Sequence, residues 1–292
     1  MSRDSTHRLA LTQDEDEGVR TVALTRFDGS RPQRAEDDVV REEPLEIQLG
    51  GAPLAVVMRT PGDDEELALG LLLNEGIVAS LDEVASIRHC TVAAAPEADG
   101  NVLRVRLRRG VKVDVRALRR NLYASSSCGV CGKATIENAL AVAPPLDDAA
   151  RFDAAFFRDL GDRLSAAQPV FADTGGLHAA ALFGPDGALL VVRDHVGRHN
   201  AVDKVIGWAL ERDRLPLAGH VLLVSGRISF EIVQKALAAR LPVVAAVSAP
   251  SSLAVDLAER AGVMLVGFLR GARCNVYGDR ARLAAPGSAP TR

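Results

Sequence analysis

The stretch VLLVSGRISFEIVQKALAARLPVVAAVSAPSSLAVDLAERAGVMLVGF, residues Val221–Phe268, decides the fold. Its expected elements alternate in type: strand Val221–Val224, helix Phe230–Arg240, strand Val243–Val247, helix Ser252–Ala261 and strand Val263–Phe268. The strand segments are apolar along nearly their whole length, which is typical of strands that are covered on both faces of a sheet. Strand and helix in strict alternation favour parallel pairing. This stretch therefore predicts a largely parallel α/β sheet.

The pattern extends upstream from that stretch to about residue 150. We expect a helix at Phe152–Gln168, strands at Leu177–Phe183 and Ala188–Arg193, and a helix at His199–Arg212. Ala141–Asp148 contains Pro144-Pro145 and is typical of a linker. Residues 150–280 are thus predicted to form one α/β domain.

The N-terminal half has a different pattern. Strands are expected at Val19–Thr25 and across Leu45–Thr60, with a hairpin turn at Gly50-Gly51. A helix should begin at Asp63 or Asp64, either of which can cap it, and end at Gly76. A second hairpin should pair residues 85–95 with 101–107. We expect a disordered tail at 1–18 and a smaller β-rich domain at 19–140, so the chain is α/β in its second half and α+β overall.

Length, composition and charge exclude several classes of protein. The chain has 292 residues, which favours about two domains, and its net charge of −3 and aromatic content of 4% disfavour nucleic-acid binding. The apolar runs are too short to span a membrane, and the polar N-terminus has no signal-peptide core. Basic residues are frequent in the stretch 104–120. Their alternation with apolar residues indicates the solvent-exposed face of a strand rather than an anion-binding site. A protein of the cytoplasm is expected.

Two of the four cysteines, Cys128 and Cys131, form a CxxC within SSSCGVCGK. Ser and Gly around the pair predict an accessible loop, and Lys133 and a following helix start favour thiolate over thiol. A zinc site lacks the further ligands it needs, because Cys90 and Cys274 are isolated, so no metal site is expected. A dithiol oxidoreductase remains open, but a loop that receives sulfur as persulfide fits best. Two inert, buried cysteines are improbable in such a polar segment.

Three turns follow strands of the second half and carry small, hydroxylated or basic residues. They contain Ser225-Gly226-Arg227, Ser248 and the segment Gly267–Arg273, which we expect to leave its strand as a turn. In a parallel sheet such turns gather at the carboxyl ends of the strands, where ligands bind. Helix N-termini beside arginines suit phosphate, so the turns favour a nucleotide-like ligand. Serine is also an ordinary helix cap.

Two histidine patterns complete the set of candidates. HVGRHN, residues 195–200, follows a strand; His199 or Asn200 could cap the next helix, and His195 and Arg198 flank Gly197, where a ligand could approach the backbone. His178 lies where zinc deaminases carry H-x-E, but Ala180 replaces the glutamate and the cysteines of P-C-x-x-C are absent. The pattern thus favours a deaminase-like fold without the zinc chemistry.

Five motifs in order resemble the formate dehydrogenase accessory sulfurtransferase family, FdhD/NarQ, from about Val19 to Gly278. They are TPGDDEELALG (60–70), SCGVCGK (127–133), TGGLH (174–178), DHVGRHNAVDK (194–204) and SAPSSLA (248–254). Cys274 departs from the pattern, since an aromatic or apolar residue is expected before Asn275. The tail is not covered by the resemblance.

The resemblance implies a sulfur carrier that is a homodimer with a cytidine-deaminase-like C-terminal domain. Such a protein accepts sulfur from a cysteine desulfurase and passes it to the bis(molybdopterin guanine dinucleotide) molybdenum cofactor, its cargo, for formate dehydrogenase. Cys128 would carry the persulfide and Cys131 would assist. The residues expected to bind the cofactor are Ser225, Gly226, Ser248, Phe268, Leu269, Arg270, Gly271, Ala272 and Arg273.

Two other functions remain open from the sequence alone. A chaperone that only binds and delivers the cofactor would need the turns but neither thiol. A general dithiol oxidoreductase would need the thiols but no cofactor. The client enzyme and the cysteine that first receives sulfur are not specified by the sequence.

Overall fold

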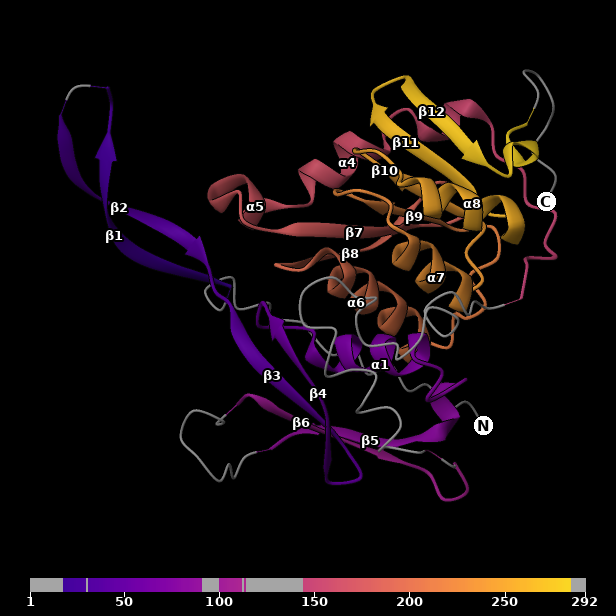
Figure 1. The fold of residues 1–292 in the computed structure, drawn as a ribbon, viewed down its shortest axis with the longest axis horizontal. Coiled ribbons are helices and arrows are strands. Elements are labelled where there is room, and N and C mark those ends of the chain that lie inside the picture. The colour runs from indigo at the N-terminus through magenta and orange to yellow at the C-terminus, as the bar shows by residue number, and fades with distance from the viewer. Residues whose placement is uncertain (1–17, 30, 91–99, 112, 114–143, 285–292) are drawn as a thin grey trace, which may run out of the picture.

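The computed structural model describes residues 18–29, 31–90, 100–111, 113 and 144–284. These residues form a mixed α/β structure with a six-stranded sheet, a four-stranded sheet and a projecting two-stranded arm (Figure 1). The predicted tail, apart from Gly18, and the whole CxxC loop lie outside the described residues.

The four-stranded sheet has the order β4-β3-β6-β5. Its strands are β3 (Glu43–Leu49), β4 (Ala52–Arg59), β5 (Val84–His89) and β6 (Val102–Leu107). The predicted turn at Gly50-Gly51 is confirmed, and both glycines have the positive φ that such a turn requires. Arg104 and Arg106 are exposed on either side of the buried Val105, so this part of the basic stretch forms the solvent-exposed face of a strand.

Helix α1 (Asp64–Asn74) joins this sheet to the second half by packing on α6 (Arg198–Glu211). A Cβ on Gly70 would overlap the carbonyl oxygen of Asp203, and one on Gly207 would overlap that of Glu66. Two glycines thus allow the helix backbones to touch. Asp63 is the N-cap residue, but its side chain makes no capping hydrogen bond because its carboxylate faces Arg193 at 3.3 Å.

The six-stranded sheet has the order β12-β11-β10-β9-β7-β8. Its strands are β7 (His178–Phe183), β8 (Leu189–His195), β9 (Val221–Val224), β10 (Val243–Ala246), β11 (Met264–Arg270) and β12 (Arg273–Gly278). The prediction of a largely parallel sheet is wrong. Only the β9–β10 and β10–β11 pairings are parallel, whereas β7–β8, β7–β9 and β11–β12 are antiparallel. Short turns join β7 to β8 and β11 to β12, which makes each of these pairs a hairpin.

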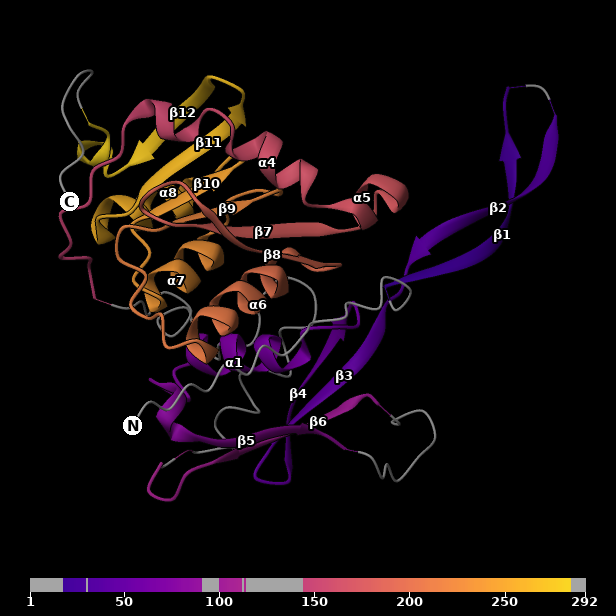
Figure 2. The same ribbon diagram turned by 180° about the vertical axis from the view of Figure 1, so that it is seen from behind.

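Helices cover both faces of this sheet. Helices α6, α7 (Phe230–Ala238) and α8 (Ser252–Ala261) lie on one face, and α4 (Leu160–Ala166) lies on the other (Figures 1 and 2). The single helix predicted at Phe152–Gln168 is wrong: a 3₁₀ turn at Ala154–Phe157 precedes α4, and α5 (Pro169–Thr174) follows. Pro169 begins α5, a position where its missing N–H costs no hydrogen bond.

The larger of two apolar cores runs from the four-stranded sheet through α1 and α6 to β9 and β10. Leu45, Leu72, Ile206 and Leu222 are fully buried in it. Because one core spans both halves, the halves are held together by apolar burial as well as by charge. The domain bounds and the likeness to cytidine deaminases stay predictions.

The arm consists of β1 (Val19–Phe27) and β2 (Pro32–Val40), which pair along their whole length. The sequence predicted β1 but not its partner. Among the described residues, no helix is long and apolar enough to cross a bilayer.

Candidate functional site at the carboxyl edge of the six-stranded sheet

The turns after β9 and β10 and residue Phe268 near the end of β11 lie side by side at one edge of the sheet. Ser225 is bound to Ala179 twice: its amide donates to the carbonyl oxygen, and its Oγ accepts from the amide, each at 2.9 Å. The amide of Phe268 donates to the carbonyl oxygen of Ser248 at 3.0 Å. Between them, the amide of Ile228 donates to the carbonyl of Ala249 at 3.1 Å. The structure therefore brings the three predicted turns together.

The segment Phe268–Arg273 is a hairpin rather than the expected turn out of the sheet. Phe268, Leu269 and Arg270 belong to β11, Gly271-Ala272 forms the turn, and Arg273 begins β12. The side chain of Leu269 is buried in the second apolar core and cannot face a ligand. Phe268, with a φ of 55°, is 44% exposed, and Arg270 to Arg273 are exposed.

The N-terminus of α6 lies beside these turns, and it carries Arg198, which the sequence singled out as a neighbour of Gly197. Gly197 is the N-cap residue and supplies no capping side chain, so the expectation that His199 or Asn200 caps the helix is wrong. Arg198 and His178 both flank Gly226: an added Cβ there would lie 3.6 Å from Arg198 Cδ and 3.5 Å from His178 Nδ1. A methyl group at this position would be in ordinary van der Waals contact with both side chains.

The guanidinium group of Arg198 has no carboxylate partner among the described residues. It makes no ion pair with any residue in the described ranges, and its buried Nε has no hydrogen-bond partner there. Burying one N–H group of a half-buried arginine without a hydrogen-bond partner is costly, because the lost hydration of that group is not replaced. An anion at this position would satisfy it.

The nearby histidines are kept neutral. Burial, followed by the charges of Arg198 and Lys235, lowers the pKa of His199 to about 3. Burial and Arg198 also lower the pKa of His178. His199 Nε2 lies 3.1 Å from Ser229 Oγ and 3.2 Å from Glu231 Oε2, and burial raises the pKa of Glu231 to about 7. Near neutral pH, both histidines are therefore neutral and add no positive charge beside Arg198.

His195 lies deeper, beside α6. Its Nδ1 accepts from the amide of Gly197 at 2.8 Å, so the ring proton is on Nε2, which is buried and has no partner among the described residues. Burial, followed by Lys204, lowers the pKa of His195 to about 3. His195 holds the turn that presents Arg198.

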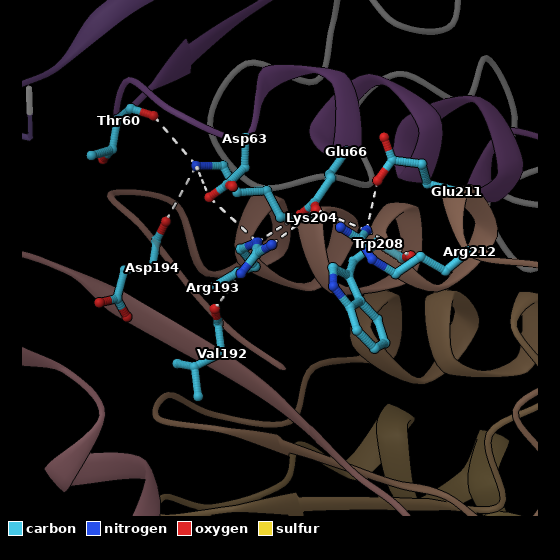
Figure 3. Close-up of polar contacts among 10 residues, drawn as sticks. All are labelled: Thr60, Asp63, Glu66, Val192, Arg193, Asp194, Lys204, Trp208, Glu211 and Arg212. Carbon is cyan, nitrogen blue, oxygen red and sulfur yellow. Dashed lines mark hydrogen bonds and ion pairs between the residues drawn. The ribbon is translucent and has the colours of Figure 1, made fainter. Parts of the chain in front are cut away.

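A network of paired charges joins the start of α1 to β8 and α6 (Figure 3). Arg193 donates to both carboxylate oxygens of Glu66, from Nε at 2.6 Å and from Nη2 at 2.8 Å. Arg212 Nη1 lies 3.3 Å from the same carboxylate, and Lys204 Nζ lies 3.4 Å from the carbonyl oxygen of Thr60. The TPGDDEE segment thus ties the two halves together, which the sequence did not reveal.

The two candidate sulfur-carrying residues, Cys128 and Cys131, lie outside the described residues. The residues flanking this segment are anchored on the body of the protein: Val113 packs against the larger core, and the carbonyl of Pro144 accepts from Arg240 Nη1 at 2.8 Å. Cys274 is half-buried on β12, beside the second core. In the described part of the chain, no group of three or more His, Cys, Asp or Glu side chains is placed to hold a metal ion.

These features define a class: a mixed α/β protein with a carboxyl-edge site that favours an anion and a CxxC segment. A solved structure of a formate dehydrogenase accessory protein from Desulfotalea psychrophila has this fold, with a TM-score of 0.73 over 91% of this chain and all of that one, at 24% identity.

The family model for the FdhD/NarQ family matches residues 40–284, and the chain belongs to that family. It is 56% identical over 242 residues to the sulfur carrier protein FdhD of Mycobacterium tuberculosis, covering 81% of this chain and 88% of the relative. It is 53% identical over 252 residues to the protein of the same name from Streptomyces coelicolor, covering 85% and 89%.

Proposed function

We propose that this chain is a cytoplasmic sulfur carrier, an enzyme that transfers sulfur for the maturation of formate dehydrogenase. It accepts sulfur from a cysteine desulfurase on Cys128 and passes it to the bis(molybdopterin guanine dinucleotide) molybdenum cofactor. The observation that carries this proposal is membership of the FdhD/NarQ family, with relatives named as sulfur carriers, in a chain that has the CxxC pair.

The loading step needs only a thiolate and a persulfide donor. The Cys128 thiolate attacks the outer sulfur of the desulfurase persulfide, the donor S–S bond breaks, and the donor cysteine leaves as a thiolate. No external oxidant or reductant is consumed. Lys133 is close in sequence and would favour the thiolate form of Cys128. Cys131 would assist the release of the sulfur from Cys128.

The carboxyl edge is proposed to bind the guanine dinucleotide part of the cargo. A pyrophosphate group is a double anion, and the edge offers Arg198, whose buried Nε has no partner among the described residues, together with exposed Arg270 and Arg273. The uncapped first turn of α6 adds backbone N–H groups that favour negative charge. These residues suit the group that the family resemblance implies.

Within that site, the predicted residues have different roles. Ser225 and Ser248 hold the turns by hydrogen bonds, and Gly226 places its backbone beside Arg198 and His178. Phe268, being exposed, is positioned to cover a planar base. Leu269 supports the hairpin from the core, while Gly271 and Ala272 form its turn.

The test is sulfur loading followed by intact-mass measurement. The protein is incubated with a cysteine desulfurase and cysteine, and the parent should gain the mass of bound sulfur while Cys128→Ala should not. Cys274→Ala is the matched control and should load like the parent. If Cys128→Ala gains as much sulfur as the parent, the carrier proposal is wrong, and a chaperone that only binds the cofactor becomes the better account.

A further inference from the structure

Three arginines gather on the outer face of the four-stranded sheet. Val105 of β6 is buried in the larger apolar core, so Arg104 and Arg106 on either side of it lie on the opposite, exposed face. Across the antiparallel pairing, Arg88 of β5 lies directly opposite Arg104, and Ser86 lies directly opposite Arg106. These strands lie beyond α1 from the six-stranded sheet (Figures 1 and 2). The arginines are thus on a different sheet from the carboxyl-edge site.

These arginines have no acidic partner in the described part of the chain. Arg88 and Arg106 make no hydrogen bond or ion pair there, and Arg104 Nε donates to the neutral Gln48 Oε1 at 3.3 Å. Glu46, on the same face, instead accepts from Gln48 Nε2 at 2.7 Å. Like charges directly opposite each other destabilise a β-pair. Exposure to solvent explains a polar face but not the facing cations of Arg88 and Arg104, and an anion lying over them would remove their repulsion.

The shape of this face fits an extended acidic segment. The three arginines line one hollow of about 560 Å³. Arg104 and Arg106 are two residues apart on one strand, about 6.7 Å, which is also the spacing of alternate side chains in an extended peptide. On the same face, Val56 and Met58 of β4 are 52% and 44% exposed. A small oxoanion would use the arginines but not this apolar margin, so the face favours a protein segment.

We propose that this face binds an extended acidic segment of the protein that donates sulfur to the chain. Carboxylates at alternate positions lie over Arg104 and Arg106, and an apolar side chain lies over β4. The inference rests on the proposed function, because it names the surface on which the donor of that reaction docks. Strand β6 ends at Leu107, and the segment that contains Cys128 follows it in the sequence. The cargo is proposed to bind on the other sheet, so a donor docked here leaves that site accessible.

The test is the rate at which a cysteine desulfurase loads the chain, measured with the chain as the varied substrate. Arg88→Glu/Arg106→Glu should raise the KM for the chain at least about tenfold at low salt and leave kcat unchanged, because only docking is weakened. The control is Arg151→Glu/Arg260→Glu, which makes the same change of net charge at exposed positions on the other half. This control should behave like the parent.

A small donor separates docking from chemistry. Glutathione persulfide gives its outer sulfur to the Cys128 thiolate and leaves as the glutathione thiolate, so no protein surface is needed. It should load the parent and both double variants at the same rate. A parent that takes sulfur from neither donor would overturn the carrier function and this inference together. A parent that loads from both donors, with an unchanged KM in Arg88→Glu/Arg106→Glu or an equal rise in the control, would overturn the docking proposal alone.

A peptide competitor reports the chemistry of the donor segment. A short peptide with glutamate at alternate positions should inhibit loading of the parent by the desulfurase, less so as salt rises, and leave loading by glutathione persulfide unchanged. The same peptide with lysine at those positions should not inhibit. Equal inhibition by both peptides would contradict an acidic donor segment.

The stability of a single variant checks that the docking face is not a structural feature. Arg88→Glu places a carboxylate opposite Arg104 and replaces a repulsive pair with an attractive one, so its thermal midpoint should rise. The variant should nevertheless load more slowly from the desulfurase at low chain concentration. A lower midpoint would contradict the repulsion on which the proposal rests.

Discussion

Each end of helix α6 carries an arginine, and the two arginines differ in whether a carboxylate lies beside them. Toward its C-terminus, Arg212 lies against Glu66 and Glu211 and over the ring of Trp208 (Figure 3). At its N-terminus, Arg198 has no ion pair among the described residues and no acid follows within the first turn. At the C-terminal end, the protein itself supplies the carboxylates that pair with the arginine. At the other end, the anion that we propose as ligand would supply the missing partner.

The difference shows how to separate structural from functional charge in this fold. Removing one member of a buried pair leaves the other uncompensated and is costly, whereas a cation that already lacks a partner loses no protein contact when it is replaced. Stability should therefore depend on the junction between α1 and α6, and ligand affinity on the N-terminal end of α6. Each prediction below tests one side of that division.

The largest expected effect comes from Glu66→Ala at the junction. It leaves Arg193 buried without the carboxylate that accepts two of its hydrogen bonds, at a cost of about 3 kcal/mol in the free energy of unfolding. Chemical denaturation of the variant and the parent measures this difference. Arg198→Met is the comparison and should change stability by less than about 1 kcal/mol. Equal losses in both variants would remove the distinction between the two ends.

A smaller effect concerns pH. His199 stays neutral in the folded protein, with its pKa lowered to about 3, while in the unfolded chain it titrates near its ordinary pKa of about 6.5. The unfolded state then binds the extra proton between these values, so the free energy of unfolding falls as the pH drops from about 6.5 toward 3. Glu231, with its pKa raised to about 7, acts in the opposite sense and loses its stabilising contribution as the pH rises through its pKa.

The measurement is the pH slope of stability between about pH 4 and 6. His199→Asn should reduce the slope by about 1.4 kcal/mol per pH unit, the value for one proton. Parallel curves for the variant and the parent would show that His199 is protonated in the folded state and that this end of α6 is more open to water.

The sequence predicted those parts of the fold that local patterns determine. Buried strands such as Val221–Val224 follow from apolar runs, and the start of α8 follows from its cap, Ser251. Strand direction depends on which strands become neighbours, which a local pattern does not contain. Strand β2 gave no signal because PQRAEDDVV lacks alternating apolar residues, and its structure depends on pairing with β1.

In the candidate site, too, local sequence patterns predicted some features and missed the contacts between distant segments. The serine and glycine turns were found because each follows an apolar strand, and the structure places them together. Glu66 and Arg193 meet across 127 positions of sequence, and no local pattern reports such a contact. Arg198 was noticed beside Gly197, but its lack of a partner is visible only once its neighbours in space are known.

The most direct test of the division between the two ends of α6 is the affinity of Arg198→Met for GDP, a probe for the guanine dinucleotide, measured by isothermal titration at fixed salt. Charge-assisted hydrogen bonds to phosphate are worth more than neutral ones, so the account predicts binding at least about tenfold weaker than in the parent, with parental stability. Cys128→Ala should bind GDP like the parent. Parental affinity in Arg198→Met would contradict the account.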